Sequence, residues 1–489
     1  MKKMKMRYWG WVLAGVLILT VSCSDWLDVN PRTEMKENDI YTSEKGFQNI
    51  MNGIYIQLAS KELYGVNMSF YFPDLLAGLW SPTSNTTEKY IAAFDYKQTN
   101  VEKTITDIWG KYYKCIAHIN NLLENLDKTE VRFSYGNKEL LKGEAYGLRA
   151  FLHLEILRLF GPVPREAAGA HEAIPYVTEL TKNPSRLVSV SYDQVQKMIL
   201  QDLDSAEMYL KNDPFTLGSM YDLNNPHSYQ INYVPDDDWH YYRQTHLNLY
   251  AVDAVRARFY QWIGNIQEAN RYARKVLAAA NPDGTEKFVL ANEANTYTAN
   301  FGKNLVMQCE HLFAVNCSDH QEKLLQVLTG IGTNRPKIYL MSRYLQTIYE
   351  KEESDIRNRS GRYFEVDGQY AYCLKYSGSG LIEPINMIPL IRLAEMYLIL
   401  IENLPWQEAQ EYFNTYRQAR GMGVNIGFNS DSEKLQRVEK EYRKEFYAEG
   451  QMFYYYKRHN IQTWTIPARV TVPQDGFVVP KPKGQTAFE

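Results

Sequence analysis

Apolar and small side chains recur every three or four residues along much of the chain, which is the period of an amphipathic helix. Between residues 246 and 280, two such series follow each other, separated by Gly264-Asn265 and stopped by Asn281-Pro282. The first runs through Leu247, Ala251, Ala254, Ala257, Tyr260 and Ile263, and the second through Ile266, Ala269, Ala273, Val276, Leu277 and Ala280. Two helices joined by almost no loop must pack antiparallel, so the pattern predicts a helical pair over 246–280.

The same spacing predicts further helical pairs near 105–160 and 388–420. The helices expected are Ile105–Leu126, Leu140–Phe160, Ile388–Asn403 and Trp406–Arg420, with single helices at Tyr192–Leu210 and Glu433–Tyr447. The positions of Tyr260, Gly264, Ala269, Ala273 and Pro282 resemble a tetratricopeptide (TPR) unit. Helix pairs of this kind stack side by side and share one core. The predicted fold class is therefore mainly α, a TPR-like scaffold of helical pairs.

Three segments break this periodicity and are rich in turn residues and aromatics. They span residues 62–100, 212–245 and 281–340. Irregular stretches of this length inside a compact domain are usually functional. We therefore expect the scaffold to carry a loop-rich, variable face that binds a ligand. No stretch of the sequence is typical of a linker between domains, so residues 23–489 are expected to form one domain.

Residues 1–22 are typical of a signal peptide and are set apart from the folded domain. A basic start is followed by an uncharged run over 8–21, which is too short to span a membrane. The run ends at Ser22-Cys23, an arrangement that resembles a bacterial lipobox. Cys23 is therefore the predicted lipidation site. Ordinary secretory cleavage near Ser22 is the alternative.

The composition limits the possible classes of function. Lys and Arg number 54 against 57 Asp and Glu, a formal charge of -3, so no basic surplus favours nucleic acid. A mean hydropathy of -0.44 excludes a polytopic membrane protein. The cysteines after Cys23 contain no Cys-x-x-Cys pair, which argues against structural zinc. Tyrosine is abundant, with 38 residues, and its ring combines an apolar face with a polar tip.

A sugar-binding site needs aromatic rings that stack on apolar C–H faces, and polar groups that bond to hydroxyls. Aromatic residues with polar neighbours inside the irregular segments are therefore the candidate ligand contacts. They form three groups: Trp80 with Asn85 and Tyr90; Trp239 with Asp237, Tyr241 and Arg243; and Tyr297. The alternative for each ring is that it packs its loop onto the scaffold.

Signals for catalysis or metal binding are weak. His171-Glu172 is followed by Pro175 where a zinc protease motif needs its second histidine. The run Asp236-Asp237-Asp238 lacks the alternation of a calcium loop and is expected to be a solvated acidic turn. A glycoside hydrolase stays open, because among 57 acidic residues some pair will always have a suitable spacing. No catalytic residue and no metal ligand is assigned from the sequence.

Several phrases spread over the chain resemble one family, the SusD/RagB lipoproteins of Bacteroidetes nutrient-uptake systems. In order along the chain, they are Cys23 to Pro31, Gly46 to Tyr55, Arg149 to Pro164, Ile391 to Leu398, Asn414 to Gly421, Glu441 to Gly450, and Val479-Pro480. One departure follows Glu449-Gly450, where Met452 and Tyr455 replace an arginine and an acidic residue. That departure weakens any transfer of the family's polar contacts there.

The resemblance implies a binding protein on a TPR-like scaffold. Such lipoproteins are held in the outer membrane by a lipid anchor such as palmitate and lie over a SusC-like TonB-dependent transporter. They pass it oligosaccharides or, in some branches, peptides. We therefore expect an outward-facing, glycan-binding lipoprotein that is not an enzyme and needs no cofactor. Some members bind calcium, but the sequence places no such site. The alternatives are a peptide-binding member, a lipid-anchored glycoside hydrolase, and a TPR-type adaptor for a protein partner.

Overall fold

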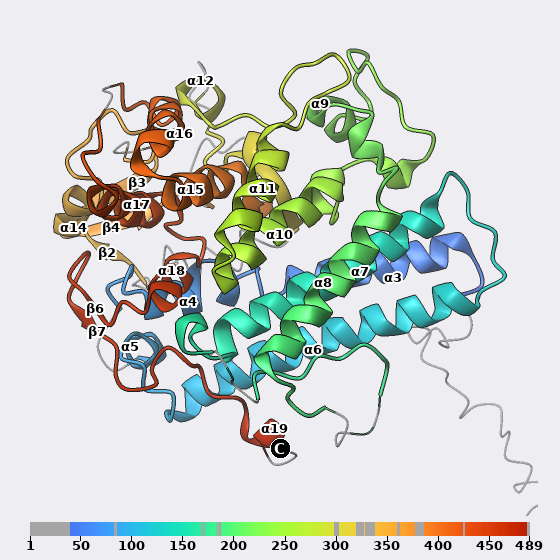
Figure 1. Cartoon of the computed structure of the whole chain (residues 1–489), viewed down its shortest axis with the longest axis horizontal. Coiled ribbons are helices and arrows are strands. Elements are labelled where there is room, and N and C mark those ends of the chain that lie inside the picture. Colours follow the sequence, from blue (N-terminus) through green and yellow to red (C-terminus); the bar gives the residue numbers. More distant parts are fainter. Residues whose placement is uncertain are drawn as a thin grey trace, which may run out of the picture.

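The structure of the chain is a computed structural model (Figure 1). It describes residues 40–82, 86–167, 169, 172–181, 183, 187–297, 303–318, 327, 338–358, 362–376, 386–423 and 426–486. The predicted signal peptide, the lipidation site Cys23 and the candidate Asn85 lie outside the described residues.

Helices dominate the described residues. They are α3 (Glu44–Leu58), the π-helix η2 (Asn67–Tyr71), α4 (Phe72–Leu76), α5 (Thr87–Ala92), α6 (Thr99–Lys128), α7 (Asn137–Phe160), α8 (Tyr192–Tyr209), α9 (Met220–Asn224), α10 (Leu249–Ile263), α11 (Ile266–Leu277), α12 (Glu293–Thr296), α14 (Ser342–Ile348), α15 (Leu393–Asn403), α16 (Trp406–Ala419), α17 (Asp431–Glu445), α18 (Met452–His459) and α19 (Lys483–Thr486). Short 3-10 turns lie between several of them. Within the described ranges, none of these helices has the length and apolar character needed to cross a membrane.

The strands are short and form three small antiparallel sheets. One pairs β1 (His311–Asn316) with β5 (Met387–Arg392). Another has the order β2 (Leu340–Met341), β4 (Tyr370–Cys373), β3 (Phe364–Asp367), and the last pairs β6 (Thr463–Trp464) with β7 (Val470–Thr471).

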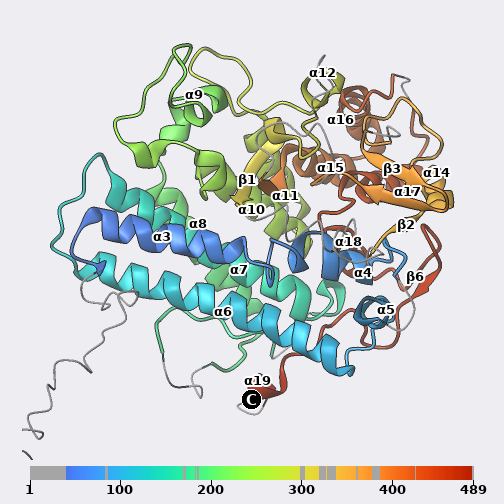
Figure 2. The ribbon, with the colours of Figure 1, turned by 180° about the vertical axis from the view of Figure 1, so that it is seen from behind.

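The long helices pack side by side in one array. Helix α6 packs on α7, α7 on α8, α10 on both α8 and α11, α11 on α15, and α15 on α16. In Figures 1 and 2 the array rises from α6 at the bottom to α16 at the top. Because neighbouring helices share their buried faces, the array has one continuous core. The predicted class, a mainly α and TPR-like fold, is confirmed.

The connection between α10 and α11 illustrates how the sequence sets this packing. Gly264 ends α10 with a φ of 80°, a conformation that glycine adopts without steric cost. Asn265 then begins α11, and its side chain accepts a hydrogen bond from the backbone N–H of Glu268. Ala269 and Ala273 are buried on α11. Small side chains at these positions let the two helices lie close together.

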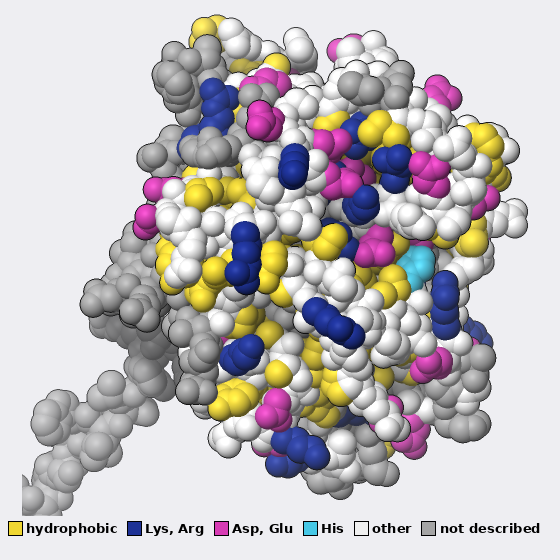
Figure 3. All heavy atoms as spheres, turned by 90° about the vertical axis from the view of Figure 1, so that its left-hand side faces the viewer, with side chains coloured by type: hydrophobic (Ala, Val, Ile, Leu, Met, Phe, Trp, Pro, Cys, Tyr) yellow, Lys and Arg dark blue, Asp and Glu magenta, His cyan; other side chains and the backbone are white. Residues whose placement is uncertain are grey.

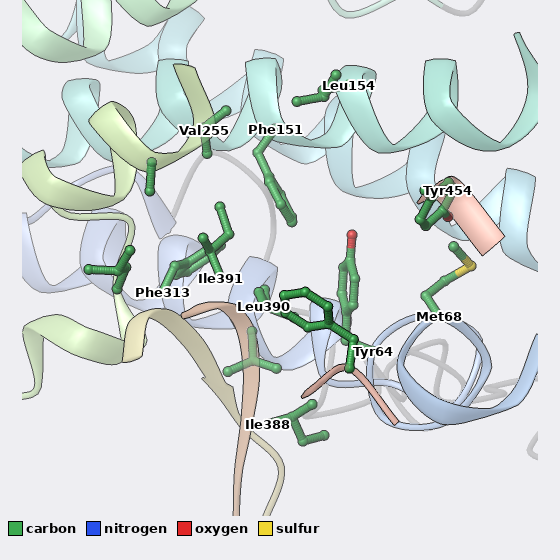
Figure 4. Packing of buried hydrophobic residues seen from close by; sticks show 14 of the residues in the cluster. Tyr64, Met68, Phe151, Leu154, Val255, Phe313, Ile388, Leu390, Ile391 and Tyr454 are labelled. Atoms are coloured by element: carbon green, nitrogen blue, oxygen red, sulfur yellow. The ribbon is translucent and has the colours of Figure 1, made fainter. Parts of the chain in front are cut away.

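One part of the core lies where α7 meets the segment before η2 and the β1–β5 ribbon (Figure 4). The ring of Phe151 on α7 has its centroid 5.8 Å from that of Tyr64 and 5.5 Å from that of Phe313 on β1. All three side chains are buried. The ribbon is therefore an internal element that the helices surround.

Strand β5 corrects one prediction. The helix expected from Ile388 begins only at Leu393, and residues 387–392 are a strand paired with β1. All six residues of β5 are buried. A short run that is buried on every side has no polar face, so its period cannot distinguish strand from helix. Strand β1 lies inside 281–340, one of the segments expected to be irregular.

The segment 62–100 also differs from the expected exposed loop. Its first part forms η2 and α4, and Phe70, Phe72, Leu75 and Leu76 are inaccessible to water. Helix α6 then begins at Thr99, ahead of the expected Ile105. Turn-forming residues in this segment therefore separate short buried helices instead of marking a solvated loop.

A network of buried charges joins the C-terminal elements. Glu445, at the end of α17, accepts hydrogen bonds from Arg357 at 2.7 Å, from Arg392 at 2.6 Å and from Arg420 at 2.9 Å. All four side chains are fully or almost fully buried. Burial alone would raise the pKa of Glu445, but the three guanidinium groups hold it well below its usual range.

The network extends to the sheet β2–β4–β3. Glu449 accepts a hydrogen bond from Arg392 at 2.7 Å and pairs with Lys375, which lies two residues after the end of β4. The hydroxyl of Tyr376 donates to the carbonyl of Ala448 at 3.0 Å. The sheet is thus fixed to the turn between α17 and α18.

We expect Glu445→Gln to destabilise the protein by about 3–5 kcal/mol, because it leaves buried arginines without their shared counter-charge. The matched control is Glu268→Gln, which breaks a pair with Arg271 nearer the surface and should cost about 0–1 kcal/mol. Urea unfolding followed by circular dichroism measures both. Equal losses for the two variants would contradict a stabilising role for the network.

Candidate functional site

Strands β3 and β4 form a tight hairpin on the outside of the molecule. Asp367 pairs with Tyr370, so the loop between the strands has two residues, Gly368 and Gln369. Gly368 has a φ of 57°, which a two-residue hairpin requires and glycine supplies. The local sequence therefore dictates this turn and, with it, the register of the strands.

That register sorts the side chains of β4 onto two faces. Ala371 and Cys373 are buried against the core, whereas Tyr370 and Tyr372 are half-buried on the outer face. On the neighbouring β3, Asp367 lies opposite Tyr370 and Glu365 lies opposite Tyr372, and both carboxylates are exposed. The outer face of the hairpin therefore combines aromatic rings with carboxylates.

A third ring completes the surface. Tyr339, next to β2, has its ring centroid 4.8 Å from that of Tyr370 at an interplanar angle of 78°. The rings of Tyr370 and Tyr372 lie 6.4 Å apart. We call Tyr339, Tyr370 and Tyr372, with Glu365 and Asp367, the tyrosine face.

The polar groups of the tyrosine face are suited to hydrogen bonding. The side-chain amide of Gln369 donates to the hydroxyl of Tyr370 at 2.8 Å. Partial burial, and then the negative charge of Asp367, raises the pKa of Tyr372. Its phenol therefore stays protonated at neutral pH and can donate a hydrogen bond.

Figure 3 views the side of the molecule that carries this sheet, where hydrophobic side chains lie in patches among separate acidic and basic ones.

Trp80, a predicted ligand contact, lies behind this sheet. It is 4% exposed, and its indole N–H donates to the carbonyl of Phe70 at 2.7 Å. Its ring contacts Tyr447, which in turn packs on Phe364 of β3. Trp80 thus supports the inner side of the sheet. Tyr90, predicted with it, is half-buried on α5.

The next residue after Trp80 reaches the tyrosine face. The backbone N–H of Ser81 donates to the carbonyl of Tyr339 at 2.6 Å. The segment that sequence analysis singled out therefore borders the tyrosine face, although its tryptophan points into the core.

The group around Trp239 anchors the segment 212–245 instead of facing solvent. Trp239 is 7% exposed, and Asp237 accepts a hydrogen bond from its backbone N–H at 2.7 Å. Tyr241 is buried. Arg243 is fully buried, where it donates to Glu144 at 2.5 Å and to both carboxylate oxygens of Asp213 at 3.0 Å.

Tyr297 is also a structural contact. It is 8% exposed, and its hydroxyl donates to the carbonyl of Ile356 at 2.6 Å. Among the described candidates, Trp80, Trp239 and Tyr297 each pack against the scaffold through different partners. Sequence analysis missed Tyr370 and Tyr372, although the alternation on either side of Asp367-Gly368 is a recognisable hairpin signal.

A polar cleft of about 400 Å³ lies between the end of α3, η2, α5 and α6. Asn67, Asn100 and Lys103 line it, and Tyr71 donates its hydroxyl to Glu88 at 2.6 Å. The cleft offers hydrogen bonds, whereas the tyrosine face offers both hydrogen bonds and several neighbouring rings. The tyrosine face is therefore the better candidate for a ligand that stacks.

Among the described residues, one acidic cluster has a spacing that could hold a metal. The carboxylates of Glu350, Glu352 and Glu441 lie within 4.8 Å of one another. Lys444 donates to Glu352 at 3.0 Å and to Glu441 at 3.2 Å, and it pairs with Glu350 at 2.8 Å. Calcium needs six to eight oxygen ligands. Carboxylates already compensated by a lysine do not fit such a site.

Comparison with known proteins finds similarity to one family over the N-terminal part of the chain. A family model described as SusD-like, "Starch-binding associating with outer membrane", matches residues 25–221. The SusD-like protein P25 of Formosa agariphila is 22% identical over 196 residues, which cover 39% of this chain and 35% of that protein. The SusD-like protein P2 of the same organism is 23% identical over 204 residues, 41% of this chain and 38% of that protein. The matches thus span little more than a third of these relatives.

Solved structures share the fold over almost the whole chain. A SusD superfamily protein from Bacteroides thetaiotaomicron has a TM-score of 0.70 and 19% identity, and the match covers 91% of this chain and 98% of that one. A putative sugar binding protein from Bacteroides vulgatus has a TM-score of 0.67 and 20% identity, with coverage of 91% and 97%. The N-terminal part of the chain is thus similar to the SusD-like family model, and the described chain shares its fold with these solved structures.

Proposed function

We propose that this chain binds oligosaccharides on its tyrosine face. The rings of Tyr339, Tyr370 and Tyr372 carry the proposal, because half-exposed rings can stack on the apolar faces of sugar rings. The carboxylates of Glu365 and Asp367 then accept hydrogen bonds from the sugar hydroxyls. The phenol of Tyr372 donates a hydrogen bond to a sugar oxygen. The description of the matching family as starch-binding supports a glycan ligand.

The proposal extends to the place of the protein in the cell. A lipid anchor on Cys23 would hold it in the outer membrane, facing outward, and it would pass its ligand to a SusC-like TonB-dependent transporter. The family description includes association with the outer membrane, which supports this location. The transporter as partner rests on the resemblance of the sequence to SusD/RagB lipoproteins.

The arrangement favours binding without hydrolysis. Glu365 and Asp367 lie two residues apart on one strand, so their Cα atoms are about 7 Å apart. A glycosidase places its two carboxyl groups about 5–9.5 Å apart. However, hydrolysis needs them on opposite sides of the scissile bond, and both lie on the same open face. Release of reducing ends from any bound oligosaccharide would contradict this part of the proposal.

Tyr370→Ala tests the binding site, because Tyr370 is the middle ring of the three. Loss of one stacking ring should weaken oligosaccharide binding by about 1–3 kcal/mol, by analogy with ring stacking on nucleobases. Isothermal titration against starch fragments and a panel of other oligosaccharides measures the effect. Tyr370→Phe keeps the ring and should lose less.

Tyr229→Ala is the matched control, because Tyr229 is 95% exposed and lies on the segment 212–245, which contributes no strand to the sheet. It should bind the oligosaccharide as the unchanged protein does. Equal affinity of Tyr370→Ala and the unchanged protein would remove the tyrosine face from the site. Binding of peptides but of no glycan would instead favour the peptide-binding alternative.

Cys23→Ala tests the anchor. Without the thiol there is no atom to carry the lipid, so the protein should leave the membrane fraction and should not incorporate labelled palmitate. Ultracentrifugation of cell lysates measures the distribution. Cys309→Ala, at a half-buried cysteine, should stay in the membrane fraction. Membrane retention of Cys23→Ala would contradict lipidation at this residue.

A further inference from the structure

A crevice enters the helical array between the α10–α11 turn, α15, α17 and α18. Its outer part has a volume of about 330 Å³, and a smaller cavity of about 30 Å³ lies next to it. Gln261, Trp262 and Arg458 line both parts, so the two share a wall. The crevice lies on elements other than those of the tyrosine face.

Several buried donors in this crevice lack an acceptor among the described residues. The side-chain oxygen of Gln261 accepts a hydrogen bond from Asn403 at 2.6 Å, whereas its amide nitrogen has no partner. The Nε of Arg158 and the hydroxyl of Tyr454 are likewise unpartnered. Gln261, Arg158 and Tyr454 are 7%, 5% and 2% exposed. Unpartnered buried donors are costly, so the crevice is built to receive hydrogen-bond acceptors.

The acidic groups of the crevice are already occupied by internal partners. Glu402 accepts from Arg458 at 2.6 Å and from His459 at 3.0 Å. Burial alone would raise the pKa of Glu402, but Arg458 and His459 hold it at about 2. Glu395 is bound by both ends of the Arg258 guanidinium, at 2.7 Å each. Both carboxylates thus already have cationic partners and compete little for an incoming ligand's donors.

An exposed arginine, Arg165, lies at the mouth of the crevice. Arg165 is exposed, lines the outer part of the crevice and forms no ion pair with a described residue. Its neighbour Glu166 accepts a hydrogen bond from Asn460 at 2.7 Å. Ile266 and Leu435, which are 51% and 39% exposed, form an apolar edge of the same opening. The mouth thus offers a planar guanidinium, which suits a carboxylate, beside apolar surface.

We infer that this crevice binds a small organic carboxylate, of the size of an amino acid or a sugar acid. Arg165 would hold the carboxylate, and the amide of Gln261 and the inner donors would bond to the remaining oxygen atoms. The apolar edge would cover the carbon skeleton. The outer volume lies in the range of pockets that hold one small molecule.

Arg165→Gln tests this inference, because the residue is exposed and its loss should leave the fold intact. The probes are sodium glucuronate, its neutral relative glucose, and L-glutamate, each titrated calorimetrically into the full-length protein. At least one of the two carboxylates should bind and glucose should not. Arg165→Gln should weaken that binding about tenfold, the value of a hydrogen bond to a charged group.

Two controls assign the binding to the crevice. Arg271→Gln removes an exposed arginine of α11 that does not line the crevice, and it should leave carboxylate binding unchanged. Tyr370→Ala should also leave it unchanged, so failure of the tyrosine face and failure of the crevice are distinguishable. Binding of glutamate alone identifies an amino acid ligand, and binding of glucuronate alone identifies a sugar acid. Equal binding of glucose, no binding of either carboxylate, or unchanged affinity in Arg165→Gln would overturn the inference.

Discussion

The buried charge of Glu445 constrains most of the C-terminal half of the described chain. An ion in a protein interior is tolerated only where opposite charges and hydrogen bonds surround it. For Glu445 these come from Arg357 in a loop, Arg392 at the end of β5 and Arg420 after α16. If one of these elements moved, a charge would lose its compensation. The network therefore fixes the relative positions of β5, α16, α17 and the loop that carries Arg357. Apolar packing alone would allow these elements to shift slightly.

The sequence phrases that resemble the SusD/RagB family include several members of this network, although Arg357 and Lys375 lie outside them. Arg392, Arg420, Glu445 and Glu449 all lie in those phrases. Gly450 belongs to them for another reason: it has a φ of 71°, and a Cβ there would lie 2.6 Å from a backbone oxygen of η2. These sequence phrases thus contain residues that the scaffold needs for its buried charges and close backbone packing. This explains why the resemblance predicted the fold and gave no residue of the tyrosine face.

Helical periodicity predicted most long helices, and it is clearest in α6 and α11, which have one buried and one solvated face. The pattern failed for β5, which is buried on every side, and for residues 62–80, whose turn residues lie inside the core. Polar neighbours are a different signal: at Trp239 and Arg243 they indicated a ligand-binding loop, whereas both side chains are buried. Buried aromatic and charged side chains need polar partners as much as a ligand does. The number of polar residues in an irregular segment therefore cannot distinguish a loop that binds a ligand from a loop that packs on the scaffold.

Strand alternation is a stronger signal, because the pleat forces neighbouring residues onto opposite faces. Once Ala371 and Cys373 are buried, Tyr370 and Tyr372 must face outward. Lys375 and Glu449 then tie the end of β4 to the charged network, so the tyrosines are held in place before a ligand arrives. A ring that is already positioned loses little conformational entropy on binding. In the proposed binding role, the buried charges would contribute to recognition without touching the ligand, because they hold the sheet on which the rings lie.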